Sequence, residues 1–307
     1  MFEIDQALSV TDGVTLQGQG WERTVIRPAA GEQIRCVKVD GGAKLVGVTL
    51  TGGRCTDEGA GVKVVNGTVS WCCISNNTAT SGGKSGAGVS FTGGCGQIDH
   101  SIVAGNTIAS GCWGAGIGGV TPSGPVVIDT CLVCGNVNPG GSGGGIGFDK
   151  PNTSLTVRNC TVTRNSAVYN TSGGLYFNNC SGGAKIALVN DIIAGNATNG
   201  SEGNIRIGDS KGVNYDFVDQ AASSHCIFGR ESEWNDIGVA DSLFGVPAFV
   251  DAAGGNFRLA EGSSAIAAGT SFAKISCDLD GRRRSSLPQP SVGCYEYNSA
   301  GFMLLLR

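Results

Sequence analysis

A column of polar side chains and glycines recurs at one position of a repeat and could bind a sugar. Its members, in chain order, are Lys63, Ser90, Gly118, Gly147, Tyr176 and Arg206. Two adjacent glycines would leave an open floor for a sugar ring, and Tyr176 would add apolar contact with a polar tip. Arg206, or Lys150 where the Gly147 strand turns, could hold the carboxylate of a uronate.

This chemistry is what a polysaccharide lyase needs: a cation that neutralises the uronate, and a Lys or Tyr that accepts a proton. The candidate catalytic residues are Lys150, Tyr176 and Arg206, and the candidate substrate-binding residues are Gly118, Gly147, Asp149 and Tyr176. The alternative interpretation is a strand of small residues with scattered polar groups on its surface.

A second candidate site is a pair of carboxylates on a bend. The bend column contains Ser70, Asp99, Asp129 and Arg158, with Trp71, His100, Thr130 and Asn159 alongside. If Asp99 and Asp129 are stacked neighbours, they could share a proton, bind Ca²⁺, or act as a retaining glycosidase pair. Alternatively, Arg158 simply neutralises them. No cofactor other than Ca²⁺ is suggested by the sequence.

Two markers recur along the chain and indicate the element that must position these residues. The first is a short glycine-containing motif, such as Gly59-Ala-Gly61, followed by an apolar residue. This apolar residue recurs at Val62, Val89, Ile117, Ile146 and Leu175. The second is an asparagine that follows an apolar strand, at Asn77, Asn106, Asn136, Asn165 and Asn196. Both advance by roughly 27–31 residues, which is longer than a leucine-rich repeat and shorter than a propeller blade. We interpret the asparagines as a stacked structural ladder.

The positions between the markers keep their character from coil to coil, as pleated strands require. Inward pairs follow the glycine marker at Val62/Val64, Val89/Phe91, Ile146/Phe148, Leu175/Phe177 and Ile205/Ile207. A smaller inward column contains Cys72, Ser101, Cys131, Cys160 and Asp191. The sequence therefore predicts an all-β fold: a single-stranded right-handed parallel β-helix of three-stranded coils, about 28–30 residues each. We expect the β-helix to span residues 1–230 and an irregular C-terminal region, 231–307, to cap it.

Composition narrows the classes of function. The net charge of −4 gives no basic footprint for nucleic acid. No apolar run is long enough to span a membrane. The 13 cysteines form no paired C-x2-C sets of a zinc site, so we expect the inward ones to be buried, unbridged thiols. The N-terminus lacks the segments of a signal peptide, so we expect that a leader has been removed or lies outside this sequence.

The tail resembles the C-terminal module of bacterial secreted proteins with right-handed β-helix repeats, the pectate-lyase-like superfamily. The motifs that carry this resemblance are Pro247-Ala-Phe-Val-Asp251, Asn256-Phe-Arg-Leu259, Asp278-Leu-Asp-Gly281 and Val292-Gly-Cys-Tyr-Glu296, and residues 11–26 resemble the opening strands of such proteins. The resemblance implies a secreted or cell-surface location. The R-x-P-x-x-R segment of pectate lyases is not found, so no catalytic residue is carried over.

The function expected from these observations is binding or processing of a polysaccharide, with an acidic glycan as the partner of the lateral strand face. If the chain is an enzyme, it is a polysaccharide lyase or a glycoside hydrolase; the alternatives are a non-catalytic adhesin and a structural spacer. We expect a monomer. Cys277 and Cys294 bracket a loop-rich part of the tail, and we expect them to form a disulfide if the protein is exported. The segment Gly301–Arg307 could be a final strand or part of a sorting tail.

Overall fold

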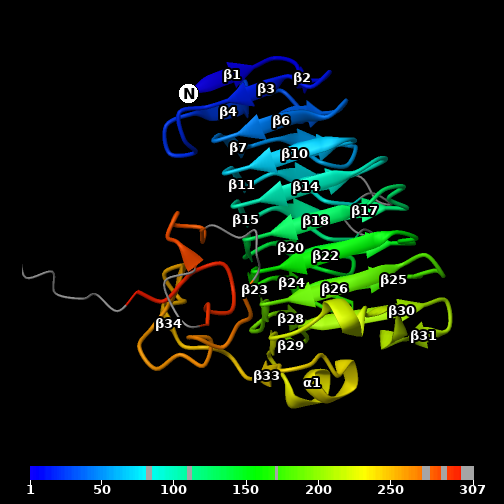
Figure 1. Ribbon diagram of the computed structural model, residues 1–307. Helices are drawn as coiled ribbons and strands as arrows, with labels where there is room; N and C mark the ends of the chain where they lie inside the picture. Colours follow the sequence, from blue (N-terminus) through cyan, green and yellow to red (C-terminus); the bar gives the residue numbers. More distant parts are fainter. Residues whose placement is uncertain (81–84, 109–112, 170–171, 272–276, 285–288, 299–307) are drawn as a thin grey trace, which may run out of the picture.

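Short strands from successive coils stack into four sheets around a main apolar core, and a small separate cluster contains Ala79, Ala87, Ile108 and Ala115 (Figure 1). The computed structural model describes residues 1–80, 85–108, 113–169, 172–271, 277–284 and 289–298. We name the four sheets A to D, with the strands given below; within one coil the chain passes through B, C, A and D in that order, and nearly all pairings between coils are parallel. The expected parallel β-solenoid is confirmed, but each central coil has a fourth short strand at the asparagine turn instead of three strands.

Sheet A contains β1 (Phe2–Ile4), β4 (Val25–Pro28), β7 (Thr49–Thr51), β11 (Cys73–Ser75), β15 (Ile102–Ala104), β19 (Leu132–Cys134), β23 (Thr161–Thr163), β27 (Ile192–Ile193), β32 (Ile227–Phe228) and β33 (Leu243–Phe244). Sheet B contains β2 (Leu8–Val10), β5 (Val37–Val39), β9 (Val62–Val64), β13 (Val89–Phe91), β17 (Ile117–Val120), β21 (Ile146–Asp149), β25 (Leu175–Asn178), β30 (Ile205–Asp209) and the antiparallel β31 (Gly212–Val213).

Sheet C contains β3 (Thr15–Gln17), β6 (Ala43–Val46), β10 (Gly67–Ser70), β14 (Gly96–Asp99), β18 (Val126–Asp129), β22 (Ser154–Arg158) and β26 (Lys185–Val189). Sheet D contains β8 (Arg54–Cys55), β12 (Thr78–Ala79), β16 (Thr107–Ile108), β20 (Val137–Asn138), β24 (Ser166–Ala167), β28 (Ala197–Thr198) and the antiparallel β29 (Ser201–Glu202). Outside these sheets lie η1 (Tyr215–Phe217), η2 (Gln220–Ala222), α1 (Glu231–Ile237), β34 (Phe249–Asp251) and β35 (Asn256–Leu259).

The bend between sheets C and A is made by a single residue with left-handed backbone. The residues at this bend are Trp71, His100, Thr130, Asn159 and Asn190, with φ between 42° and 54°. Asparagine tolerates this conformation better than most residues, whereas a β-branched or bulky residue there is unusual. The bend therefore places the side chains of this column one above the next along the edge of the solenoid, and two of them, Trp71 and His100, carry rings.

The core is built from the predicted inward columns. Val62, Val89, Ile117, Ile146, Leu175 and Ile205 are paired in register in sheet B, and each is at most 4% exposed. Two positions later, the ring of Phe148 stacks at 6.5 Å on Phe91 and at 6.0 Å on Phe177. Phe148 also fills the space beside Gly119, where an added Cβ would lie 2.8 Å from its ring.

The asparagines form the predicted ladder. The Nδ2 of each residue donates to Oδ1 of the next at 2.9–3.2 Å, through Asn77, Asn106, Asn136, Asn165, Asn196 and Asn204. The ladder ends at Glu233 on α1, whose carboxylate accepts from both the backbone and the side chain of Asn204. From Asn77 to Asn196 the left-handed conformation belongs to the residue before each asparagine, such as Asn76 or Gly105, and not to the ladder residue itself.

The small inward column is also confirmed. Cys72, Cys131 and Cys160 are fully buried free thiols, and Ser101 and Asp191 are buried beside them. Asp191 accepts hydrogen bonds from the backbone N–H groups of Cys160 at 2.8 Å and Val189 at 3.1 Å. Burial raises the pKa of Asp191 well above its usual range.

The C-terminal region does more than cap the end of the solenoid. α1 lies at that end, while β34 lies beside the stack (Figure 1). Sheet A continues to Phe244, which is beyond the boundary expected at residue 230. The described residues of the tail from Phe249 pack sideways on sheet A: Phe257, Leu279 and Tyr295 share one buried cluster with Leu132, and Leu259, Ala265 and Val292 share another with Ile192.

Candidate functional site

The predicted glycine floor has the expected register but is not open. Ser90, Gly118, Gly147, Tyr176 and Arg206 are consecutive partners in sheet B. However, Gly118 and Gly147 are buried under the backbone of glycine turns: Gly86 and Trp113 lie over Gly118, and Trp113 and Gly114 lie over Gly147. A Cβ on Gly118 would lie 2.7 Å from both Gly86 N and Trp113 O. The glycines permit two layers of backbone to touch, so they do not form the open floor that was expected to accept a sugar ring.

The polar residues of this first candidate site are not gathered for catalysis either. Tyr176 is 8% exposed, and its hydroxyl donates to Asn178 Oδ1 at 3.0 Å; burial raises the pKa of this tyrosine. Asp149 is 3% exposed and accepts from Asn178 at 2.7 Å and Asn179 at 3.0 Å. Lys150 is exposed to solvent, and Arg206 is partly exposed beside Tyr176. The buried cluster is therefore a structural hydrogen-bond network.

The second candidate pair is adjacent, as predicted, because Asp99 and Asp129 are register partners in sheet C. Asp129 is only 7% exposed and its oxygens are occupied: Arg158 Nε donates at 2.8 Å, Asn159 Nδ2 at 3.0 Å and Thr130 Oγ1 at 2.9 Å. Arg158 therefore pairs with Asp129, which is one half of the alternative that it neutralises both carboxylates. Within the described parts of the chain, no group of three or more His, Cys, Asp or Glu side chains could hold a metal ion.

Asp99 has different partners and faces the tail. Its Oδ2 accepts from Ser70 Oγ and Gln97 Nε2, both at 2.9 Å, and its Oδ1 lies 3.1 Å from His100 Nδ1. The other ring nitrogen of His100 lies 3.5 Å from Cys277 Sγ. Cys294 is a buried free thiol whose backbone N–H donates to Thr161 Oγ1 at 3.1 Å. The expected Cys277–Cys294 disulfide is therefore not formed, because the tail places the two residues against different coils.

Aromatic rings from three coils stack along the edge of the solenoid beside this contact. The ring centroids of Trp71 and His100 are 4.5 Å apart at an interplanar angle of 18°, and those of Trp21 and Trp71 are 6.1 Å apart at 27°. Trp71 and His100 occupy the same bend position in successive coils, so the left-handed backbone of this column produces the stack. Both tryptophans are only partly buried.

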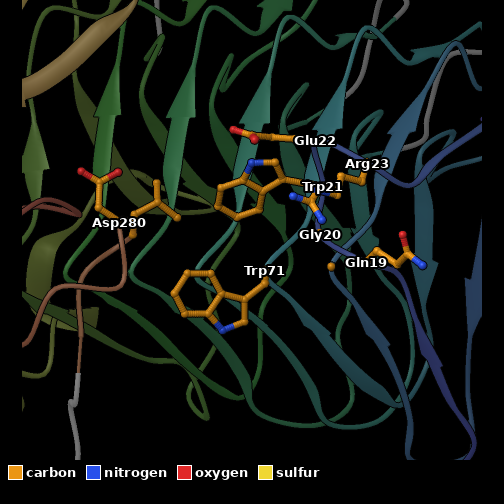
Figure 2. Close-up of a pocket in the computed structure, with 9 residues that line it drawn as sticks. Gln19, Gly20, Trp21, Glu22, Arg23, Trp71 and Asp280 are labelled. Carbon is orange, nitrogen blue, oxygen red and sulfur yellow. The ribbon is translucent and has the colours of Figure 1, made fainter.

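The two indoles line an open pocket of about 350 Å³. Figure 2 shows the rings beside each other, with Asp280 on one side and Gln19 and Arg23 on the other. Glu22 and the buried Leu279 complete the polar rim and the apolar wall. This arrangement of an apolar base with a few polar groups around it is typical of a small-molecule or sugar site.

This pocket is not among the sites predicted from the sequence. Trp71 and His100 are at equivalent positions of the repeat, and this shared position was the available signal. Trp21 lies in an early coil without a marker, and Leu279 and Asp280 come from the tail, which has no repeat that would align it with the solenoid.

Residues 35–214, more than half of the chain, match the family described as a right handed beta helix region. The chain belongs to this family. The right-handedness expected from the repeats thus agrees with the match. No curated protein matches the chain. In the part of the chain that the structure describes, there is no helix with the length and apolar character needed to cross a membrane.

Proposed function

We propose that the chain is an extracellular or cell-surface protein that binds a polysaccharide in the pocket between Trp21 and Trp71. The observation that supports this most directly is the pair of stacked, partly exposed indoles that line an open hollow. An indole offers a wide apolar face with a polar N–H at its edge, which suits a ligand that presents both C–H and O–H groups. Isolated surface aromatics are common, but a stacked pair in a hollow is not.

The charges at the rim favour a neutral glycan over a polyuronate. Glu22 and Asp280 are acidic and Arg23 is basic, so the rim carries both signs. Asp280 is itself paired with Arg258 at 2.5 Å and Arg282 at 3.3 Å. A site for an acidic polymer would instead need an excess of cations. The acidic preference expected from Arg206 and Lys150 therefore does not carry over to this pocket.

Affinity electrophoresis against a panel of neutral and acidic polysaccharides tests this proposal. We expect retardation by at least one neutral polymer, with little dependence on salt because no ion pair dominates. Trp21→Ala should weaken that binding by about 2- to 13-fold, since an aromatic contact contributes about 0.5–1.5 kcal/mol.

Tyr169→Ala is the matched control, because Tyr169 is 59% exposed and lies outside the pocket. Its affinity should equal that of the wild type. Equal binding by the wild type and Trp21→Ala would show that the glycan, if one binds, sits elsewhere.

A further inference from the structure

A thiol, an imidazole and a carboxylate lie in a row where the tail meets the bend of the solenoid. Cys277 Sγ is 3.5 Å from His100 Nε2, and His100 Nδ1 is 3.1 Å from Asp99 Oδ1. A nucleophile, a base within hydrogen-bond reach and a third group that orients the base are the parts of a nucleophilic triad. Cys277 is 177 positions from His100 in the sequence, so only the folded tail brings the thiol to the other two residues.

The contact with Asp99 favours the tautomer of His100 that can act as a base towards the thiol. An ionised Asp99 can only accept, so an imidazole that donates to it carries its hydrogen on Nδ1, whereas the Cys277 carbonyl oxygen would accept from the other tautomer. Nε2 then has a free lone pair and faces the thiol. In this tautomer Nε2 can take the proton of Cys277. The resulting imidazolium would face the thiolate and also the Cys277 carbonyl oxygen, which is 3.3 Å from Nε2.

The imidazole and the carboxylate are both held in place before any ligand arrives. Trp71 stacks on the imidazole ring at 4.5 Å, and the backbone N–H of His100 donates to Asp129 O at 3.1 Å. Asp99 is fixed from its other side by Ser70 and Gln97. Such second contacts keep a base in the orientation that it needs, and a loosely held base loses much of its effect.

The segment that carries Cys277 is fixed by the carboxylate of Asp278. This fully buried side chain accepts from the backbone N–H groups of Asp280 at 3.0 Å, Arg282 at 2.7 Å and Glu296 at 2.8 Å. The N–H of Leu279 donates to Cys294 O at 2.9 Å. The turn directs Leu279 and Asp280 to the Trp21–Trp71 pocket, while Cys277 itself is partly exposed. Leu279, which lines the pocket, is thus only two positions after Cys277 in the sequence.

We propose that Cys277 is a nucleophile for acyl esters, with His100 as its general base and Asp99 as a positioning residue. Sγ bonds to the ester carbonyl carbon while Nε2 takes the thiol proton. The C–O bond then breaks, and the leaving alcohol takes the proton from Nε2. The acyl group is left as a thioester on Cys277, and water hydrolyses it to a carboxylic acid and restores the thiol. This inference goes beyond polysaccharide binding and does not depend on it.

The first experiment measures alkylation of the native chain by iodoacetamide, with each cysteine followed by peptide mass spectrometry. Cys95 is exposed and serves as an ordinary thiol in the same sample. At neutral pH, Cys277 should react at least about tenfold faster than Cys95. Transfer of its proton to His100 would give a reactive thiolate, whereas an ordinary exposed thiol is only a few per cent ionised at that pH. Equal rates at the two cysteines would overturn the proposal.

Two variants separate the roles of the imidazole and the carboxylate. His100→Phe keeps a flat ring for Trp71 to stack on, and the equivalent bend position already accepts an aromatic residue at Trp71. It should bring Cys277 to the rate of Cys95 without lowering the melting temperature. Asp99→Asn should shift the pH profile of Cys277 alkylation towards that of Cys95. An unchanged rate in His100→Phe refutes the role of His100.

The second experiment tests acyl transfer with p-nitrophenyl acetate. We expect a burst of one nitrophenolate per chain and one acetyl group on Cys277 in the wild type, and neither in Cys277→Ser or His100→Phe. Fast alkylation without acetylation would overturn the acyl chemistry. No glycan is present in either experiment, so the alkylation and acetylation results do not depend on the outcome of the Trp21→Ala binding test.

Discussion

Replacing Gly147 by alanine should destabilise the chain, although the side chain gained is a single methyl group. The added Cβ would meet the backbone nitrogen of Gly114 and would lie 2.9 Å from its Cα and 3.0 Å from Trp113 C. All three atoms belong to the backbone of a neighbouring coil, so none can rotate away. Forcing a methyl group into a packed site costs about 1–3 kcal/mol.

The size of the thermal shift follows from the chain length. With an unfolding entropy of roughly 2.1 cal/mol/K per residue, a loss of about 2 kcal/mol lowers the melting temperature of 307 residues by about 3 °C. Urea denaturation followed by far-UV circular dichroism should show a lower midpoint with an unchanged slope, because the surface exposed on unfolding is the same.

Gly182→Ala is the matched control for this substitution. Nothing lies within 4 Å of a Cβ built on Gly182. Its free energy of unfolding should be unchanged or raised by up to about 1 kcal/mol, because alanine reduces the entropy of the unfolded chain. If Gly147→Ala is as stable as Gly182→Ala, the turn does not pack on sheet B, and the open glycine floor becomes tenable again.

Three further outcomes follow from the core. Phe148→Ala should lower the free energy of unfolding by about 3–5 kcal/mol, because this ring is 1% exposed between two others; a loss below about 1 kcal/mol in urea denaturation would contradict the stacked core. Asp191 has a raised pKa when folded, so the folded state holds its proton more tightly and wild-type stability should fall as the pH rises above the unfolded value of about 3.9. Asp191→Ser, which copies Ser101 of the same column, should remove that part of the pH dependence of the melting temperature, and an unaltered pH profile would argue against it. The buried thiols of Cys72, Cys131 and Cys160 should resist alkylation in the native chain and react after denaturation. Rapid labelling of the native chain would count against their burial.

The repeat could be predicted because burial and pleat leave a signature in every coil. Val89, Ile146 and Leu175 are apolar at the same phase, and the asparagine after each strand is required by a ladder that only an amide can continue. Asp99 and Asp129 were placed side by side by the same reasoning. These predictions need to know only which residues of adjacent coils are neighbours, and the length of the repeat gives that information.

The exposure of the glycine column could not be predicted in the same way. The sequence does not distinguish a glycine that leaves space for a ligand from one that leaves space for neighbouring backbone. Gly147 is of the second kind. The partner of Cys277 was missed for a related reason. Proximity in sequence suggested Cys294, whereas the lateral packing of the tail placed the thiol beside His100.

The sideways course of the tail has a mechanical consequence. In an ordinary solenoid each coil touches only the coils next to it, so pulling on one end can peel the coils away in turn. Here the tail fastens coils that are not neighbours: it contacts His100, Leu132, Thr161 and Ile192 on the way. Its non-covalent contacts therefore connect several coils along the stack. Under force, the coils from His100 to Ile192 should unfold together, with a single large extension, only after the tail has detached from them.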